Sequence, residues 1–250
     1  MSGLIWNFNN GIANLNSGDL SARVDPAIPW RGLHQISMAG NPIPGMSLLG
    51  VESDSNLDRT PPSDLYVRGT DLIACYESVS QRPLHPHLYW RELTQPNPPG
   101  VMAGLELVVS VQTHLLDSDP KLSICSRMEA SEVYELTSTD PVHFESVATE
   151  SHGHHADTES KGLVLTRLED GKTSYLQMVH PSDWQQTNPS LVSEAEKGVL
   201  LRNNLFLERL EKGVIRRARL RGLFLNRQND LQTAIACYHE FANSAPPLTV

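Results

Sequence analysis

The sequence predicts an all-β protein, a large antiparallel β-sandwich that ends in one C-terminal α-helix. Apolar and polar residues alternate at every second position over residues 105–115 and again over 214–225, which is the period of a half-buried strand. Segments rich in Gly, Pro, Asn and Asp separate these and most other short apolar runs. Helical spacing of apolar residues is convincing only in the tail.

The first 62 residues predict short extended segments separated by turns. Residues 4–8 alternate apolar and polar, and 47–51 form a short strand candidate. Residues 39–45 contain Pro42 and Pro44, which exclude a helix there. The polar, acidic segment 52–64 follows as a surface loop.

The middle of the chain predicts the clearest strands. Gly69 is expected to place a bulge or bend within one long strand that covers residues 65–67 and 71–77. An aromatic strand follows at 87–93, and the regular alternation of 105–115 comes next. Residues 121–128 and 132–137 are expected to form two further strands.

Two hairpins and the helix complete the chain. Asp170 and Gly171 lie between the alternating runs 162–168 and 173–180, a strong hairpin signal. A second hairpin is predicted from 204–210 to 214–225, with its loop at 211–213. The helix is expected at about 230–243, where it covers an edge or one end of the sandwich, and Pro246 ends it.

Length and patterning favour a single domain over residues 1–250. Two β-sandwich halves, split near 95–100 or 148–161, are the alternative.

Composition limits the partners. The net charge of −9 gives no general attraction for nucleic acid, whose binding depends on phosphate neutralisation. No window reaches the ~20 consecutive apolar residues of a membrane span. The N-terminus lacks the pattern of a secretion signal, and the three widely spaced cysteines favour buried thiols over disulfides. We therefore expect a cytoplasmic protein with no membrane partner and no cofactor.

Basic residues are concentrated in one segment of this acidic chain. Residues 197–230 hold nine basic and three acidic side chains, and Arg217, Arg219 and Arg221 share one face of the predicted strand 214–225. These arginines are expected to pair with carboxylates of neighbouring strands or to extend into water. A face that binds carboxylate or phosphate is the alternative.

Polar residues on the second face of strand 105–115 indicate a candidate ligand site. Glu106, Ser110, Gln112 and His114 share that face, and burying them without partners costs about 1–3 kcal/mol each. A concave, open sheet face is therefore expected, with fixed polar groups for a small polar or anionic ligand such as a sugar or sugar acid. The residues expected to line it are Arg68, Arg91, Gln112, His114, His180 and Arg219.

An enzyme of mutarotase or lyase type is the alternative to a non-catalytic binding or assembly protein. Proton transfer on a sugar requires a positioned acid and base, and His180 with Glu106 is the candidate pair. Common nucleophile, nucleotide and zinc-hydrolase motifs are absent from the sequence. The histidines His152, His154 and His155 lie in a hydrophilic segment without a predicted scaffold, so we assign no metal to them.

The segments LYVRGTDLIACY, LELVVSVQTHLLDSDP, YLQMVHPSDW and LEKGVIRRARLRGLFL resemble a conserved bacterial family of uncharacterised proteins, over about residues 65–250. That resemblance implies no activity and no catalytic residue. The number of strands in a chain of this length is also similar to the supersandwich of galactose-mutarotase-like proteins, which is a likeness of fold alone.

Overall fold

A computed structural model describes residues 5–53, 59–77, 84–93, 98–147, 161–191 and 198–245. These residues form 17 strands, one short 3₁₀ helix (Pro29–Arg31) and one α-helix, α1 (Asp230–Ala242). The strands are β1 (Trp6–Asn9), β2 (Ile12–Ser17), β3 (Leu20–Val24), β4 (Leu33–Met38), β5 (Asn41–Pro42), β6 (Ser47–Ser53), β7 (Asp64–Arg68), β8 (Asp71–Cys75), β9 (Leu84–Glu92), β10 (Val101–Thr113), β11 (Leu122–Thr139), β12 (Val142–Ser146), β13 (Leu163–Leu168), β14 (Thr173–Val179), β15 (Gln186–Leu191), β16 (Gly198–Leu205) and β17 (Ile215–Asn226).

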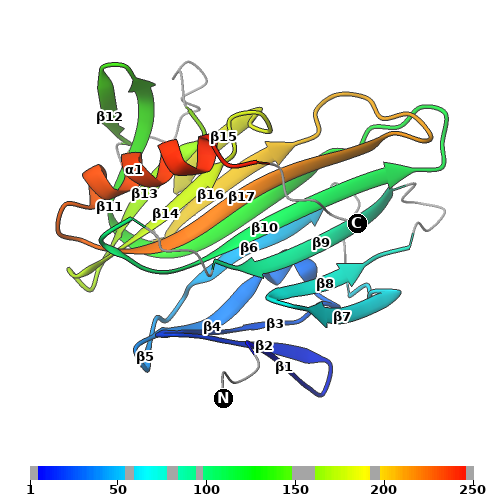
Figure 1. Ribbon diagram of the computed structural model, residues 1–250, viewed down its shortest axis with the longest axis horizontal. Coiled ribbons are helices and arrows are strands. Elements are labelled where there is room, and N and C mark those ends of the chain that lie inside the picture. Colours follow the sequence, from blue (N-terminus) through cyan, green and yellow to red (C-terminus); the bar gives the residue numbers. More distant parts are fainter. Residues whose placement is uncertain are drawn as a thin grey trace.

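All strand pairs are antiparallel, as expected, and they form two layers. The large sheet has the order β7-β8-β9-β10-β17-β14-β13-β11-β12. The small sheet runs β1-β2-β3-β4-β6-β11-β16-β15, and β5 pairs with β4. Figure 1 shows the long strands β9, β10 and β17 of the large sheet side by side.

Strand β11 belongs to both layers. Its first half, up to Glu129, pairs with β6 and β16, and its second half, from Ala130, pairs with β13 and β12. The register shifts between Ala130 and Glu132 at this change of partner. The prediction of two strands over 121–128 and 132–137 is therefore wrong, because the 18 residues of β11 continue through the expected break.

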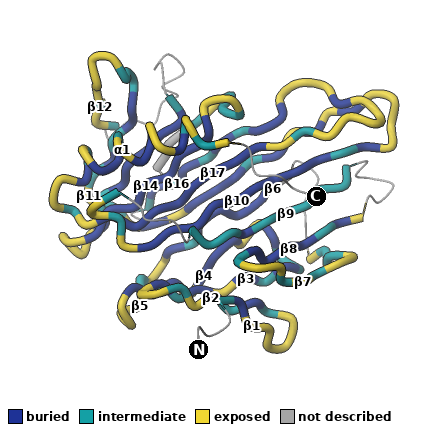
Figure 2. Tube along the Cα trace, viewed as in Figure 1, coloured by how far each residue is buried: buried dark blue, intermediate teal, exposed yellow. Residues whose placement is uncertain are grey.

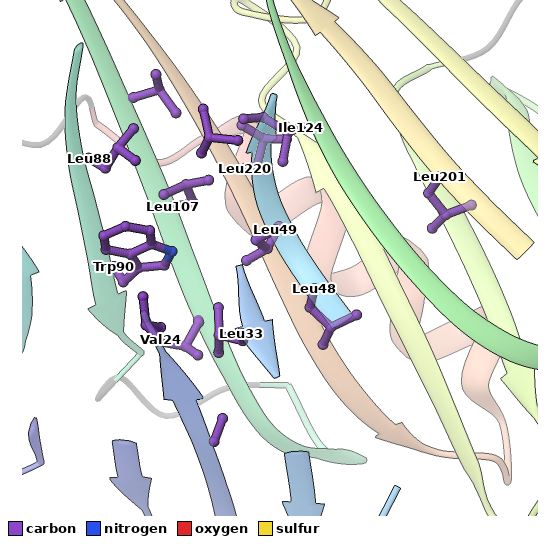
Figure 3. Close-up of a cluster of buried hydrophobic side chains, with 14 of the residues drawn as sticks. Val24, Leu33, Leu48, Leu49, Leu88, Trp90, Leu107, Ile124, Leu201 and Leu220 are labelled. Carbon is purple, nitrogen blue, oxygen red and sulfur yellow. The ribbon is translucent and has the colours of Figure 1, made fainter. Parts of the chain in front are cut away.

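The main core lies between the two sheets. Trp90, Leu88 and Leu107 come from the large sheet, and Figure 3 shows them close to side chains of the small sheet such as Leu33 and Leu49. All five are at most 1% exposed. Burial of such side chains contributes about 1.5–3 kcal/mol each relative to exposure in water.

Helix α1 packs on the outer face of the large sheet, so the prediction that it covers an edge or one end is wrong. Its buried residues Ala234, Cys237 and Phe241 form a second apolar cluster with leucines that β13, β14 and β17 direct outward. Figure 1 shows the red helix lying across these strands. The apolar stripe of the helix binds the face because a run of Leu side chains on three adjacent strands offers it a matching surface.

Two predicted connections differ in the structure. Gly69, at φ 60°, lies in the turn of a tight hairpin between β7 and β8, not at a bulge within one strand. The predicted hairpin 204–225 does not form, because β16 pairs with β11 and β15 whereas β17 pairs with β10 and β14. The connection between β16 and β17 crosses from the small sheet to the large one.

Two further sequence features lie outside the described residues. The first is the segment with His152, His154 and His155. The second is most of the two regions, 95–100 and 148–161, at which the chain was proposed to split into two halves. In the part of the chain that the structure describes, no helix has the length and apolarity required to cross a membrane.

Candidate functional site

A row of alternating charges crosses the outer face of the large sheet. Strand register aligns five side chains of β7, β8, β9, β10 and β17, in the order Arg68, Asp71, Arg91, Glu106 and Arg221. Directly opposed side chains on neighbouring strands lie within interaction distance, so opposite charges stabilise one another along the row.

Ion pairs connect this charged row and extend it to α1. Arg91 donates two hydrogen bonds of 2.8 Å to the Asp71 carboxylate and lies 3.8 Å from Glu106. Arg221 donates from Nε to Glu106 at 2.9 Å, and its Nη1 donates to Glu240 of α1 at 3.2 Å. Hydrogen bonding to Asp71 raises the pKa of Arg91. The prediction that arginines of this strand pair with carboxylates of neighbouring strands is confirmed for Arg221. Arg219 instead lies 3.4 Å from Asp183, which is in the turn after β14.

A second row, which contains two tyrosines, lies beside the charged row. Tyr66, Ile73, Tyr89, Val108 and Arg219 are aligned across the same five strands. Burial raises the pKa of the Tyr89 hydroxyl, and Cys75 and Tyr66 add to this effect, whereas Arg217 and Arg68 oppose it. These effects indicate that Tyr89 lies among the charged and polar groups at the β7–β10 side of the face.

A third row continues toward the far end of β9 and β10. Asp64, Cys75, His87, Ser110 and Arg217 are aligned in it. Beyond this row, Gln112 pairs with His85, whose ring contacts the ring of His114 edge-on at 6.1 Å. Burial lowers the pKa of His87, and His85 lowers it further. Figure 2 shows intermediate exposure along β9 in this region, in contrast to the buried tube of β14.

The six expected ligand-lining residues fall into three places on this face. Arg68 and Arg91 lie in the charged row, and Gln112 and His114 lie beside His85 at the far end of β9 and β10. His180 and Arg219 lie beneath the end of α1. Sequence reasoning missed Tyr66, Asp71 and Phe241 as neighbours of these residues. The alternation in DLYVR and the position of Phe241 on the apolar helix stripe were the available signals.

His180 and Glu106 share this face but are separated by β17. The backbone N–H of His180 donates to Arg219, whereas Glu106 is opposite Arg221 and binds it. The His180 ring hydrogen-bonds Ser182 through Nδ1 at 2.8 Å and contacts the Phe241 ring edge-on at 5.1 Å. Burial lowers the pKa of His180, and Arg219 lowers it further. Glu106 acts on the His180 pKa only through its charge, which raises it, and no hydrogen bond between the two side chains is found among the described residues.

Thiol and metal chemistry gain no support in the described part of the chain. Cys125 and Cys237 are buried free thiols, and burial raises the pKa of each to about 12, so both are protonated near neutral pH. No group of three His, Cys, Asp or Glu side chains among the described residues is arranged to hold a metal ion.

The fold is similar to that of several solved structures, two of which carry aldose epimerase in their names. A proposed aldose 1-epimerase from Escherichia coli K12 matches with a TM-score of 0.57 and 10% identity, over 84% of this chain and 97% of that one. The Slr1438 protein of Synechocystis sp. PCC 6803 matches with a TM-score of 0.57 and 9% identity over 88% and 99%. A GalM/aldose epimerase homologue from C. elegans matches with a TM-score of 0.53 and 8% identity over 84% and 97%.

No protein-family model matches the chain, and no curated protein sequence matches it either. The likeness to these solved structures is thus one of fold, in agreement with the expected galactose-mutarotase-like supersandwich.

Proposed function

We propose that this protein is a non-catalytic, cytoplasmic binding protein that holds a small polar or anionic ligand, such as a sugar or sugar acid, on the outer face of its large sheet. The observation that carries the proposal is the polar, partly exposed area that α1 leaves uncovered. Tyr66 and Tyr89 supply aromatic surfaces there, and the half-buried Gln112 supplies hydrogen-bonding groups. The likeness in fold to proteins whose names refer to aldose epimerases supports a carbohydrate ligand.

Arginine side chains at the margins of this area favour a ligand with a negative charge. Arg68 and Arg217 are exposed at opposite sides of Tyr89 and both affect its pKa. Guanidinium groups bind carboxylates through charge-assisted hydrogen bonds, which are about twice as strong as neutral ones. A sugar acid can therefore place its ring on an aromatic side chain and its carboxylate on an arginine.

Sugar epimerisation is the second candidate, and the fold likeness alone favours it. It requires an acid and a base within hydrogen-bond reach of one sugar. His180 directly follows β14 and Glu106 lies on β10, with β17 between them, and Glu106 already binds Arg221. Binding without catalysis therefore fits the arrangement of these two side chains better.

Titration calorimetry with neutral sugars and sugar acids at millimolar concentration tests the binding function. Tyr89→Ala is expected to weaken binding about tenfold, since loss of one aromatic contact is worth roughly 1 kcal/mol or more. Tyr134→Ala is the matched control, because Tyr134 binds Glu132 and Arg167 at the other side of the face. Absence of binding by every sugar and sugar acid in the wild-type protein would refute the proposal.

Polarimetry separates the two candidates. The optical rotation of freshly dissolved α-D-glucose or α-D-galactose should fall to its equilibrium value at the spontaneous rate in the presence of the protein. An acceleration that Glu106→Gln or His180→Gln abolishes would favour the epimerase.

A further inference from the structure

The last turn of α1 lies on charged and polar residues, in contrast to the middle of the helix. The earlier turns place Ala234 and Cys237 on outward-facing leucines. Phe241, in the last turn, lies over the guanidinium groups of Arg221 at 4.4 Å and Arg219 at 5.8 Å. It also contacts the His180 ring. Stable helix packing does not require two buried arginines, whose removal from water is unfavourable.

Arg219 is held by long hydrogen bonds to the chain's own C-terminal segment. Its side chain is 5% exposed, and its Nη1 donates to the Ser244 carbonyl and Ser244 Oγ at 3.4 Å and to the Ala245 carbonyl at 3.2 Å. Its Nε lies 3.4 Å from Asp183. Typical N–H···O distances are about 2.9–3.0 Å, and Arg91 reaches Asp71 at 2.8 Å. Among the described residues, this buried guanidinium is thus bound by the Asp183 carboxylate and by neutral oxygens of Ser244 and Ala245, all at long distances of 3.2–3.4 Å.

His180 adds an unused polar atom beside this guanidinium. The side chain is more than nine-tenths buried, and its Nε2 has no hydrogen-bond partner among the described residues. The Ala242 backbone raises the pKa of His180, but Nε2 forms no hydrogen bond with it. A buried polar atom without a partner costs about 1–3 kcal/mol, so a ligand atom that satisfied it would gain binding energy.

We propose that Arg219 and His180 form a carboxylate-binding subsite and that residues 241–245 occupy it when no ligand is bound. The inference rests on the proposed binding of a sugar acid to this sheet face. A carboxylate would replace the carbonyl oxygens of Ser244 and Ala245 with shorter, charge-assisted bonds. The end of α1 must lift for this to happen, which also separates Glu240 from Arg221. The helix end then acts as an internal competitor. The apparent affinity for the ligand equals the affinity of the lifted state multiplied by the fraction of molecules in which the helix end is lifted.

Calorimetry with D-glucuronate and D-glucose tests this competition, because the two sugars differ only in the carboxylate. Phe241→Ala should loosen the helix end and tighten glucuronate binding about tenfold while glucose binding stays unchanged. Glu240→Gln removes only the link to Arg221 and leaves the core intact, and it should also tighten glucuronate binding. This variant tests the competition if Phe241→Ala does not fold. Arg219→Gln should reduce the preference for glucuronate over glucose.

Leu231→Ala is the matched control, because it removes apolar contact at the opposite end of α1. It should leave glucuronate affinity unchanged. Hydrogen exchange of the amides of residues 241–245 should become faster when glucuronate binds. Equal glucuronate affinity in the wild type, Phe241→Ala and Glu240→Gln, with glucose still bound, would overturn the competition alone. Absence of binding of both glucuronate and glucose in the wild type and in every variant would overturn the proposed function as well.

Discussion

The outer face of the large sheet has two parts that share one strand pattern and differ in what lies above them. On β13 and β14 this face carries leucines such as Leu163 and Leu176, which α1 covers. On β7 to β10 the same face carries tyrosine, histidine and charged side chains. Period-two alternation selects which residues share a face, but the chemistry of those residues decides whether a helix can pack there.

The two ends of α1 are attached in correspondingly different ways. At its start, Asp230 is 1% exposed and accepts hydrogen bonds from Arg167 at 2.8 and 3.0 Å and from Ser174 at 2.7 Å. Burial favours a higher pKa for Asp230, but the bonds from Arg167 and Ser174 outweigh it and lower the pKa. At its end, Glu240 is half exposed and has one bond to Arg221. The start of the helix should therefore be more firmly attached than its end.

Arg167→Leu should have the largest effect on stability, because it leaves the Asp230 carboxylate buried without its guanidinium partner. Loss of one member of a buried ion pair costs about 3–5 kcal/mol, and urea denaturation followed by circular dichroism measures it. Arg209→Leu removes an exposed pair with Asp117 and should change stability far less, because water and salt screen exposed ion pairs. A similar loss in both variants would remove the distinction between a buried anchor and a surface ion pair.

Leu176→Ala, in the part of the face that α1 covers, should lower the free energy of unfolding by about 3 kcal/mol. The side chain is fully buried between the sheet and α1, and the loss combines transfer of apolar atoms with a cavity. The free energy of unfolding in urea measures the change. A loss below about 1 kcal/mol would mean that the helix packs loosely on these leucines.

Stability should fall as the pH is lowered below about 6.5. Burial lowers the pKa values of His34, His87 and His180 in the folded protein. The unfolded chain then binds protons first, near pH 6.5, so the stabilisation present above this pH is lost as the pH falls toward the folded-state pKa values. Urea midpoints at pH 7.5 and 5.5 measure the trend, and His180→Gln should make it shallower. An unchanged slope in this variant would show that His180 does not contribute.

Tyr66→Ala should have the smallest effect on stability, within about 0.5 kcal/mol. Tyr66 is 39% exposed on the edge strand β7, and substitutions at such positions seldom affect folding. The same change should weaken ligand binding measurably. A loss of stability equal to that of Leu176→Ala would show that this area is part of a packed core and not a binding surface.

The sequence pattern predicted strands β10 and β17 and the helix well, because each depends on local periodicity. The face shared by Arg217, Arg219 and Arg221 followed from alternation and is confirmed by the register with β10. Pairing partners were harder to predict. The hairpin expected between 204–210 and 214–225 looked local, but long-range pairing with β11 and β10 replaced it. Gly69 fitted a bulge as well as a turn, since glycine permits both.

The site could be predicted only in part for the same reason. Polar alternation over residues 105–115 identified Gln112 and His114, and strand ends pointed to His180. Nothing in the local pattern showed that α1 would lie on this face, so the burial of His180 and Arg219 beneath Phe241 could not be foreseen. A residue's exposure depends on the element packed above it, which the residue's own strand does not encode.

The shared strand β11 has a consequence for the order of folding. Its first half needs partners from residues near 50 and near 200, and its second half needs β13. Contacts so distant in sequence form slowly and require most of the chain to be present. We expect that the nascent polypeptide emerging from the ribosome stays without its final structure until β16 and β17 have been synthesised, and that it then depends on chaperones to avoid aggregation.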